Sequence, residues 1–154
     1  MSRASSSAAL RGTVLGIDYG ERRIGVAVGE LSLRIAHPVR TLHAASDRAR
    51  LEQLAPLMQE WQPVLVVVGL PGHMDEGEHP GEHPLAARCR GFAHKLSNRF
   101  SVEVRMVDER LTSCAADQDL LAAHVPAHRR RQVLDQVAAQ TILETFFAAH
   151  DQSA

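Results

Sequence analysis

The stretch Thr13–Glu30, TVLGIDYGERRIGVAVGE, decides the fold that we expect for this chain. Two apolar runs, Val14–Ile17 and Ile24–Val28, flank a short polar turn that contains Gly20. Apolar runs joined by such a turn predict a β-hairpin. The first strand ends with Asp18, and a carboxylate inside an apolar run is costly to bury unless its charge is paired. Two interpretations stay open at this point: Asp18 caps the turn, or it belongs to a metal or phosphate site.

The length and composition of the chain favour an ordinary globular protein. Its 154 residues are enough for one domain with its own core. The formal net charge of -1 does not indicate a nucleic-acid binder, so any such surface has to be local. The two cysteines, Cys89 and Cys114, are far apart and typical of reduced thiols, and no apolar run reaches membrane-spanning length. We therefore expect a cytoplasmic protein without membrane contact, with a flexible tail over residues 1–12 and a domain over residues 13–150.

Beyond the hairpin the chain alternates between apolar strands and amphipathic helices. Further strands are predicted over residues 33–42, 64–68 and 102–107, and helices over residues 46–60, 85–100, 112–123 and 133–150. Pro38 suits a strand at the edge of the sheet, whereas the β-branched run Val64–Val68 predicts a strand buried on both faces. This order predicts an α/β fold, a mixed five-stranded sheet with helices on both faces.

Acidic residues are expected at one edge of this sheet. Ligand sites of such folds lie beyond the carboxyl ends of the parallel strands, where Asp18 and Glu109 fall. Asp135 is expected at the start of the last helix, where it either complements the helix dipole or joins the other two acids. Asp108 is a second choice, since it faces the other side of its strand. Carboxylates this close repel one another unless a cation lies between them, and their oxygens suit Mg²⁺ or Mn²⁺ in phosphodiester hydrolysis.

Basic residues are expected around these acids, and histidines in a loop beside them. The candidates for contacts to a nucleic-acid backbone are Arg22, Arg23, Arg110, Arg129, Arg130 and Arg131. For the last three, a solvated run of charge is the alternative. The loop Gly72–Pro84 contains His73, His79 and His83, whose spacing matches no familiar zinc pattern, so a solvated loop is favoured over a zinc site.

Four segments together resemble the bacterial YqgF/RuvX family. They are LGIDYGERRIGVAVGE, VVVGLPGHMDEGE, VDERLTS and VLDQVAAQTILE, in the family's order, and the resemblance covers about residues 13–148. It implies a ribonuclease-H-like fold, an acidic site on Asp18, Glu109 and Asp135, and Mg²⁺ or Mn²⁺ as cofactor. Arg110 and Thr112 match the family's DERLT run and are expected to support the site or contact substrate. The chain departs from the family at Gly72-His73, where Leu-Asn is usual, and in a longer His-rich loop.

The resemblance implies a metal-dependent nuclease that processes the 5′ end of pre-16S rRNA. The alternative is a resolvase acting on branched DNA, which needs two active sites in a homodimer, so a monomer and a homodimer are both open. The GIDYG hairpin also resembles the phosphate-binding hairpin of actin-like ATPases, which need a second domain to clasp a nucleotide. A non-catalytic binding module in ribosome assembly is a further alternative.

Overall fold

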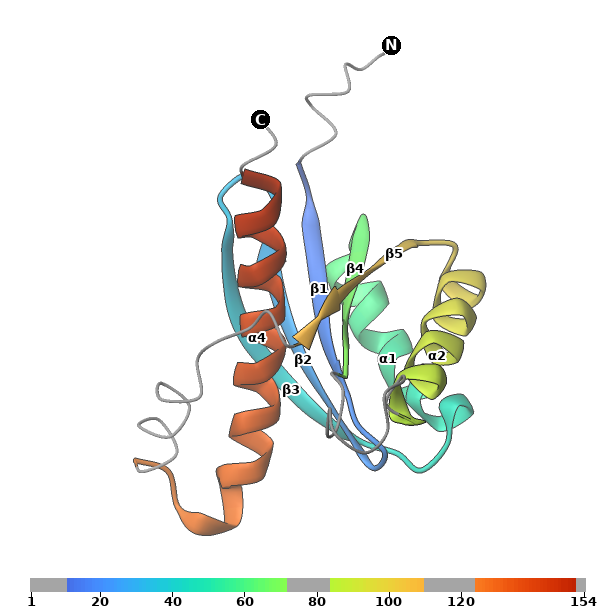
Figure 1. Ribbon diagram of the computed structural model, residues 1–154, viewed down its shortest axis with the longest axis vertical. Helices are drawn as coiled ribbons and strands as arrows, with labels where there is room; N and C mark the ends of the chain where they lie inside the picture. Colours follow the sequence, from blue (N-terminus) through green and yellow to red (C-terminus); the bar gives the residue numbers. More distant parts are fainter. Residues whose placement is uncertain (1–10, 72–83, 110–123, 152–154) are drawn as a thin grey trace, which may run out of the picture.

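The fold is a five-stranded sheet between two layers of helix, as seen in a computed structural model of the chain (Figure 1). The structure describes residues 11–71, 84–109 and 124–151. The strands are β1 (Thr13–Tyr19), β2 (Arg23–Glu30), β3 (Ile35–His43), β4 (Leu65–Leu70) and β5 (Glu103–Asp108). The helices are α1 (Asp47–Trp61), α2 (Pro84–Phe100), the short 3-10 helix η3 (Ala127–Arg129) and α4 (Arg130–Asp151).

The sheet has the order β3-β2-β1-β4-β5. β1 and β2 form the predicted antiparallel hairpin, and β4 and β5 run parallel to β1 on its other side. β3 forms the edge next to β2, as Pro38 predicts, and Ala27 pairs with Pro38 just after a shift in register. The carboxyl ends of β1, β4 and β5 therefore meet at one edge of the sheet, as expected.

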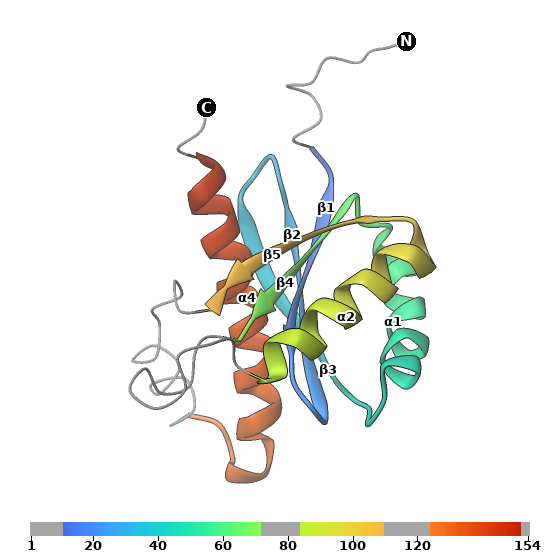
Figure 2. The ribbon, with the colours of Figure 1, turned by 45° about the vertical axis from the view of Figure 1, so that its right-hand side comes forward.

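Each face of the sheet carries its own apolar core, because side chains alternate between the faces along every strand. Leu15, Ile17 and Tyr19 of β1 pack with the buried sides of α1 and α2. Val14 lies on the other face, where α4 covers the sheet with Ala139, Ile142, Leu143, Phe146 and Phe147. Of the helices that the structure describes, Figure 2 shows α1 and α2 together on one side and α4 on the other. The predicted α/β sheet with helices on both faces is confirmed.

The structure moves some predicted boundaries. Val64 precedes β4 and is 52% exposed, so the strand buried on both faces begins only at Leu65. α4 begins at Arg130, three residues before the start that the apolar pattern predicts. The tail before residue 11, the helix predicted over 112–123 and the loop histidines lie outside the described residues. No described helix is long and apolar enough to cross a membrane.

Candidate active site

Asp18 lies near the end of β1 on the face that α4 covers, between two glycines. Its partner in the register on β2 is Gly25, and its partner on β4 is Gly69. A Cβ atom on Gly25 would lie 1.9 Å from the backbone oxygen of Asp135. A Cβ atom on Gly69 would lie 2.3 Å from Cδ1 of Ile142 and 3.1 Å from Cγ of Glu109. The two glycines thus leave the space in which α4 and Glu109 approach the Asp18 carboxylate.

Asp18 and Glu109 form a carboxyl pair. Glu109 directly follows β5, whose carboxyl end is two strands away from that of β1. Burial raises the pKa of Asp18 well above its ordinary value, the charge of Glu109 and a shared side-chain hydrogen bond raise it further, and Asp135 adds to the effect. The charge of Arg23 acts in the opposite direction. Without a cation, the pair is therefore stabilised by holding a proton between its two carboxyl groups.

Asp135 reaches the same edge from α4, but it is held by an arginine. Arg23 Nε donates a hydrogen bond of 2.6 Å to Asp135 Oδ2, and the two side chains are 31% and 19% exposed. Asp135 lies beyond the first turn of α4, which contains no acid, so its expected role of complementing the helix dipole is wrong. The predicted alternative, a place beside the other acids, stays open. Arg23, predicted as a nucleic-acid contact, is engaged with Asp135 here.

The edge strand fixes this part of α4. The Thr41 hydroxyl donates a hydrogen bond of 2.7 Å to the backbone oxygen of Gln132 and accepts one of 3.3 Å from Gln136 Nε2. Both partners lie within one turn of Asp135, and Thr41 pairs with Gly25 in the register. The position of Asp135 over the sheet is therefore set by β2 and β3 together.

The acids lie beside an open cavity of about 310 Å³, lined by Asp18, Gly20, Glu21, Arg22, Arg23 and Asp135. Within the described ranges, no three His, Cys, Asp or Glu side chains are grouped closely enough to hold a metal ion. The donor set nevertheless suits a hard divalent cation, because the half-buried carboxyl groups of Asp18 and Glu109 already meet, and a positive charge there would relieve their repulsion. Asp135 could complete such a site through Oδ1 while Oδ2 stays with Arg23, or through both oxygens after leaving Arg23.

The other predicted contacts differ in their distance from the acids. Arg22 is exposed on the turn between β1 and β2 and lines the same cavity as Asp18 and Asp135. Arg129, Arg130 and Arg131 are exposed at the start of α4, where Arg130 Nε donates to the backbone oxygen of Val125 at 3.0 Å. Their contacts to nucleic acid stay predictions. Arg110 and Thr112 lie outside the described residues.

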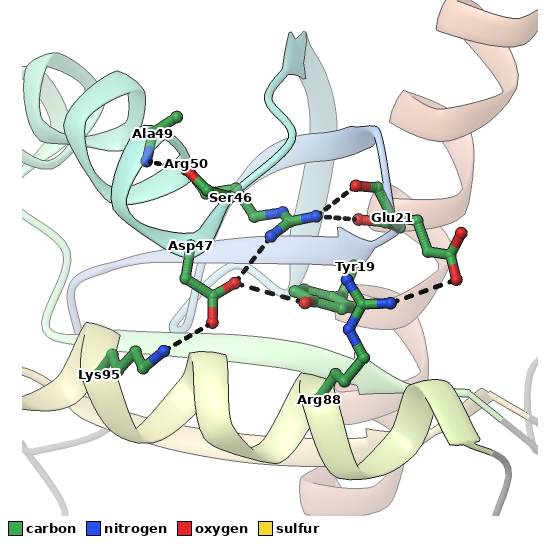
Figure 3. A network of polar contacts seen from close by, with 9 residues as sticks. Tyr19, Glu21, Ser46, Asp47, Ala49, Arg50, Arg88 and Lys95 are labelled. Carbon is green, nitrogen blue, oxygen red and sulfur yellow. Dashed lines mark hydrogen bonds and ion pairs between the residues drawn. The ribbon is translucent and has the colours of Figure 1, made fainter.

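A buried arginine supports the turn beside the site, and the sequence analysis missed it. Arg50 of α1 is 1% exposed and donates to Asp47 Oδ1 at 2.7 Å, to the backbone oxygen of Gly20 at 3.1 Å and to that of Glu21 (Figure 3). Its guanidinium also lies 4.9 Å from the centre of the Tyr19 ring. Arg50 lies on the same side of α1 as the buried Leu51 and Leu54. A charged residue on this apolar side of a helix is the signal in the sequence that could have identified Arg50.

The comparisons with known proteins agree with this fold. A family model described as RuvX, Holliday junction resolvase, matches residues 12–149. A protein named "Putative pre-16S rRNA nuclease" from Methylobacillus flagellatus is 47% identical to this chain, and the alignment covers 92% of this chain and 94% of the relative. A protein of the same name from Neisseria gonorrhoeae is 46% identical, with 88% of this chain and 87% of the relative covered.

Solved structures of resolvases share the fold. Thermus thermophilus RuvC in complex with a Holliday junction substrate superposes with a TM-score of 0.58 at 16% identity, covering 93% of this chain and 98% of that one. The fowlpox virus Holliday junction resolvase gives a TM-score of 0.51 at 10% identity, covering 89% and 99%. The expected ribonuclease-H-like fold is thereby confirmed, and the chain belongs to the RuvX family.

Proposed function

We propose that the chain is a divalent-metal-dependent nuclease whose reaction takes place at Asp18. The observation that carries this proposal is the half-buried carboxyl pair of Asp18 and Glu109 at the carboxyl ends of parallel strands, with Asp135 nearby. Partial burial and the nearby charge of Glu109 raise the pKa of Asp18, and repulsion between the two carboxylates does not stabilise the fold. A cation that binds between them turns the repulsion into a binding site.

Asp18 and Glu109 would hold the cation, and Asp135 would join them. Divalent ions in such sites activate a water molecule and stabilise the leaving oxygen of a phosphodiester. Mg²⁺ and Mn²⁺ are the ions that this oxygen-only donor set suits. Once Asp135 leaves Arg23, the freed guanidinium has a phosphate oxygen as its natural partner, since it donates in the planar fork that phosphate accepts. Arg22, exposed on the same cavity, would bind the next phosphate along the strand.

The substrate that the relatives favour is RNA. Relatives at 46% and 47% identity carry names that assign them to pre-16S rRNA, and they align over most of both chains. We therefore propose processing of the 5′ end of this precursor in the cytoplasm. Branched DNA is the second candidate, because the family description is that of a Holliday junction resolvase and RuvC shares the fold. Paired cuts across a junction would need a homodimer with two active sites.

A parallel cleavage assay tests the proposal. The wild type, Asp18→Asn and the matched control Glu60→Gln, an exposed acid on α1, are offered a pre-16S leader RNA, an unrelated single strand and a four-way DNA junction with Mg²⁺ or Mn²⁺. We expect cleavage of the leader RNA by the wild type and by Glu60→Gln, and none by Asp18→Asn or without a divalent ion. Equal cleavage by Asp18→Asn would refute the site, and symmetric cuts in the junction would favour the second candidate.

A further inference from the structure

α2 presents a face that contains cations and no acids. Its sequence, PLAARCRGFAHKLSNRF, contains four Arg or Lys residues and no Asp or Glu. The buried side of the helix consists of Ala86, Cys89, Phe92, Ala93 and Leu96, so the charged residues lie on the solvent side. A surface helix normally mixes both signs of charge, because pairs of opposite charge along it are stabilising. The single sign of charge on α2 makes its solvent side a candidate surface for an anionic partner.

Three of these cations form a line. Arg88, Lys95 and Arg99 are separated by seven and four residues, a spacing that places them on the same side of a helix. At 1.5 Å per residue the line is about 16 Å long. The strands of duplex DNA carry a phosphate about every 3.4 Å along the axis, so this line spans several phosphates of a nucleic acid.

The line begins at the edge of the proposed active site. Arg88 Nη1 lies 3.3 Å from Glu21 Oε2, and Glu21 also lines the cavity of Asp18 (Figure 3). Lys95 Nζ lies 3.1 Å from Asp47 Oδ2, one step further along α2. Arg88 and Glu21 are 52% and 65% exposed, and an ion pair between exposed groups contributes little free energy. A phosphate can therefore replace Glu21 as the partner of Arg88 at small cost. Asp47 is only 20% exposed, but it also pairs with Arg50, so it keeps a partner when the 58% exposed Lys95 binds a phosphate.

A cleft beside this line has a glycine in its wall. The cleft, about 480 Å³ in volume, is lined by Arg88, Lys95, Gly91, Tyr19 and the start of α1. A Cβ atom on Gly91 would have no heavy atom within 4 Å, so packing among the described residues does not require glycine there. Glycine inside a helix costs about 1 kcal/mol relative to alanine. Its presence between the two cations leaves room for another molecule to approach the helix backbone.

We propose that α2 is a second contact surface for nucleic acid, and that Arg88, Lys95 and Arg99 bind the sugar-phosphate backbone of the strand that leaves the active site. This inference rests on the proposed nuclease function for the direction of the strand. We assign the three side chains to binding and not to the chemical step.

Binding without turnover tests the surface. The triple variant Arg88→Gln, Lys95→Gln, Arg99→Gln is compared with a control of equal charge, Arg11→Gln, Arg40→Gln, Arg105→Gln, whose residues are exposed on other elements. The affinity for a 30-nucleotide leader RNA is measured in EDTA from low to high salt. We expect the slope of log affinity against log salt to fall by about 2 in the first variant, since each contact to a single strand contributes about 0.7. At 0.1 M salt, this change in slope corresponds to an affinity for the RNA that is lower by up to about 100-fold. Each single substitution should give about one third of the change in slope.

Cleavage of short and long RNA separates this inference from the proposed function. On an oligonucleotide of about five residues around the cleaved bond, the triple variant should match the wild type, whereas on the long RNA its KM should rise with kcat unchanged. An unchanged slope and KM, or equal losses in the control, would overturn the inference while leaving the nuclease in place. A lower slope in a protein that cleaves nothing would refute the nuclease and support the surface. Polyglutamate, a model for an acidic protein, is offered to the same variants. If the triple variant lost binding to polyglutamate but kept its affinity for RNA, the face would belong to an acidic protein partner and the proposal would be overturned.

Discussion

Substitution of Gly25 by alanine tests how closely α4 must approach the sheet. Gly25 pairs with Asp18 in the register, and a Cβ atom at this position would lie 1.9 Å from the backbone oxygen and 2.3 Å from the backbone carbon of Asp135. Both contacts are with backbone, so no side-chain rotation can relieve them. Real Cβ atoms essentially never come closer than 3.0 Å, so α4 has to move away from β2 by more than 1 Å at Asp135.

This displacement has a cost in stability and a larger one in activity. Overpacking of a well-packed contact costs about 1–3 kcal/mol, and in a protein of this size each kcal/mol lowers Tm by about 2–4 °C. A misplacement of about 1 Å in a catalytic site can lower the rate about 100-fold. We expect Gly25→Ala to lower Tm by about 5 °C and kcat by about 100-fold.

Gly91→Ala is the matched control, because the added methyl group would meet no heavy atom within 4 Å. It should raise the stability by about 0.5–1 kcal/mol and leave the cleavage of short RNA unchanged. Tm is measured by circular dichroism and kcat under saturating substrate. A Gly25→Ala protein with wild-type Tm and wild-type kcat would refute the argument that glycine sets the distance between α4 and Asp18.

The remaining predictions concern the charges around the site. Asp18→Asn should raise Tm in metal-free buffer, and by more at pH 7 than at pH 4. The pKa of Asp18 is raised in the folded protein, so the protonated carboxyl group stabilises the fold at low pH, and this stabilisation is lost as the pH rises through the pKa. Arg23→Gln should bind Mn²⁺ about fivefold more tightly in calorimetry, since the ion pair with Asp135 no longer competes with the metal. Burial above all, and then the charges of nearby acids, raises the pKa of the Cys89 thiol to about 12. The thiol is therefore protonated and unreactive at pH 8. In a Cys114→Ser background, Cys89 should react with a disulfide reagent at this pH only after denaturation.

Each of these predictions has a result that contradicts it. Equal gains in Tm at both pH values would mean that the ionised Asp18 carboxylate is not the destabilising group. Weaker Mn²⁺ binding by Arg23→Gln would make the arginine a support of the metal site, and Arg22→Gln, which removes a neighbouring exposed arginine, is the control. Rapid modification of Cys89 in the native protein would show that the N-terminal part of α2 opens to solvent.

The sequence predicted the parts of this protein that depend on local pattern. Alternation and turn chemistry located the hairpin, Pro38 indicated the edge strand, and the rule for parallel strands brought Asp18 and Glu109 to one edge. The partner of Asp135 could not be predicted, because Arg23 lies 112 residues away in the chain and only the docking of α4 brings the two together. The start of α4 was missed because Arg130 and Arg131 are exposed and add nothing to an apolar stripe.

The position of α4 has a consequence for how the protein is made. α4 follows all five strands along the chain, and among the described helices it is the one that covers this face of the sheet, with Ile142, Leu143, Phe146 and Phe147. A nascent chain that has completed the strands still exposes that face and still lacks Asp135. Because domains acquire structure as they are synthesised, the burial of the second core and the arrival of the third acid coincide in one folding step. Under the proposed function, a partly made chain lacks one acid of the site, so we expect it not to cut nucleic acid before α4 is in place.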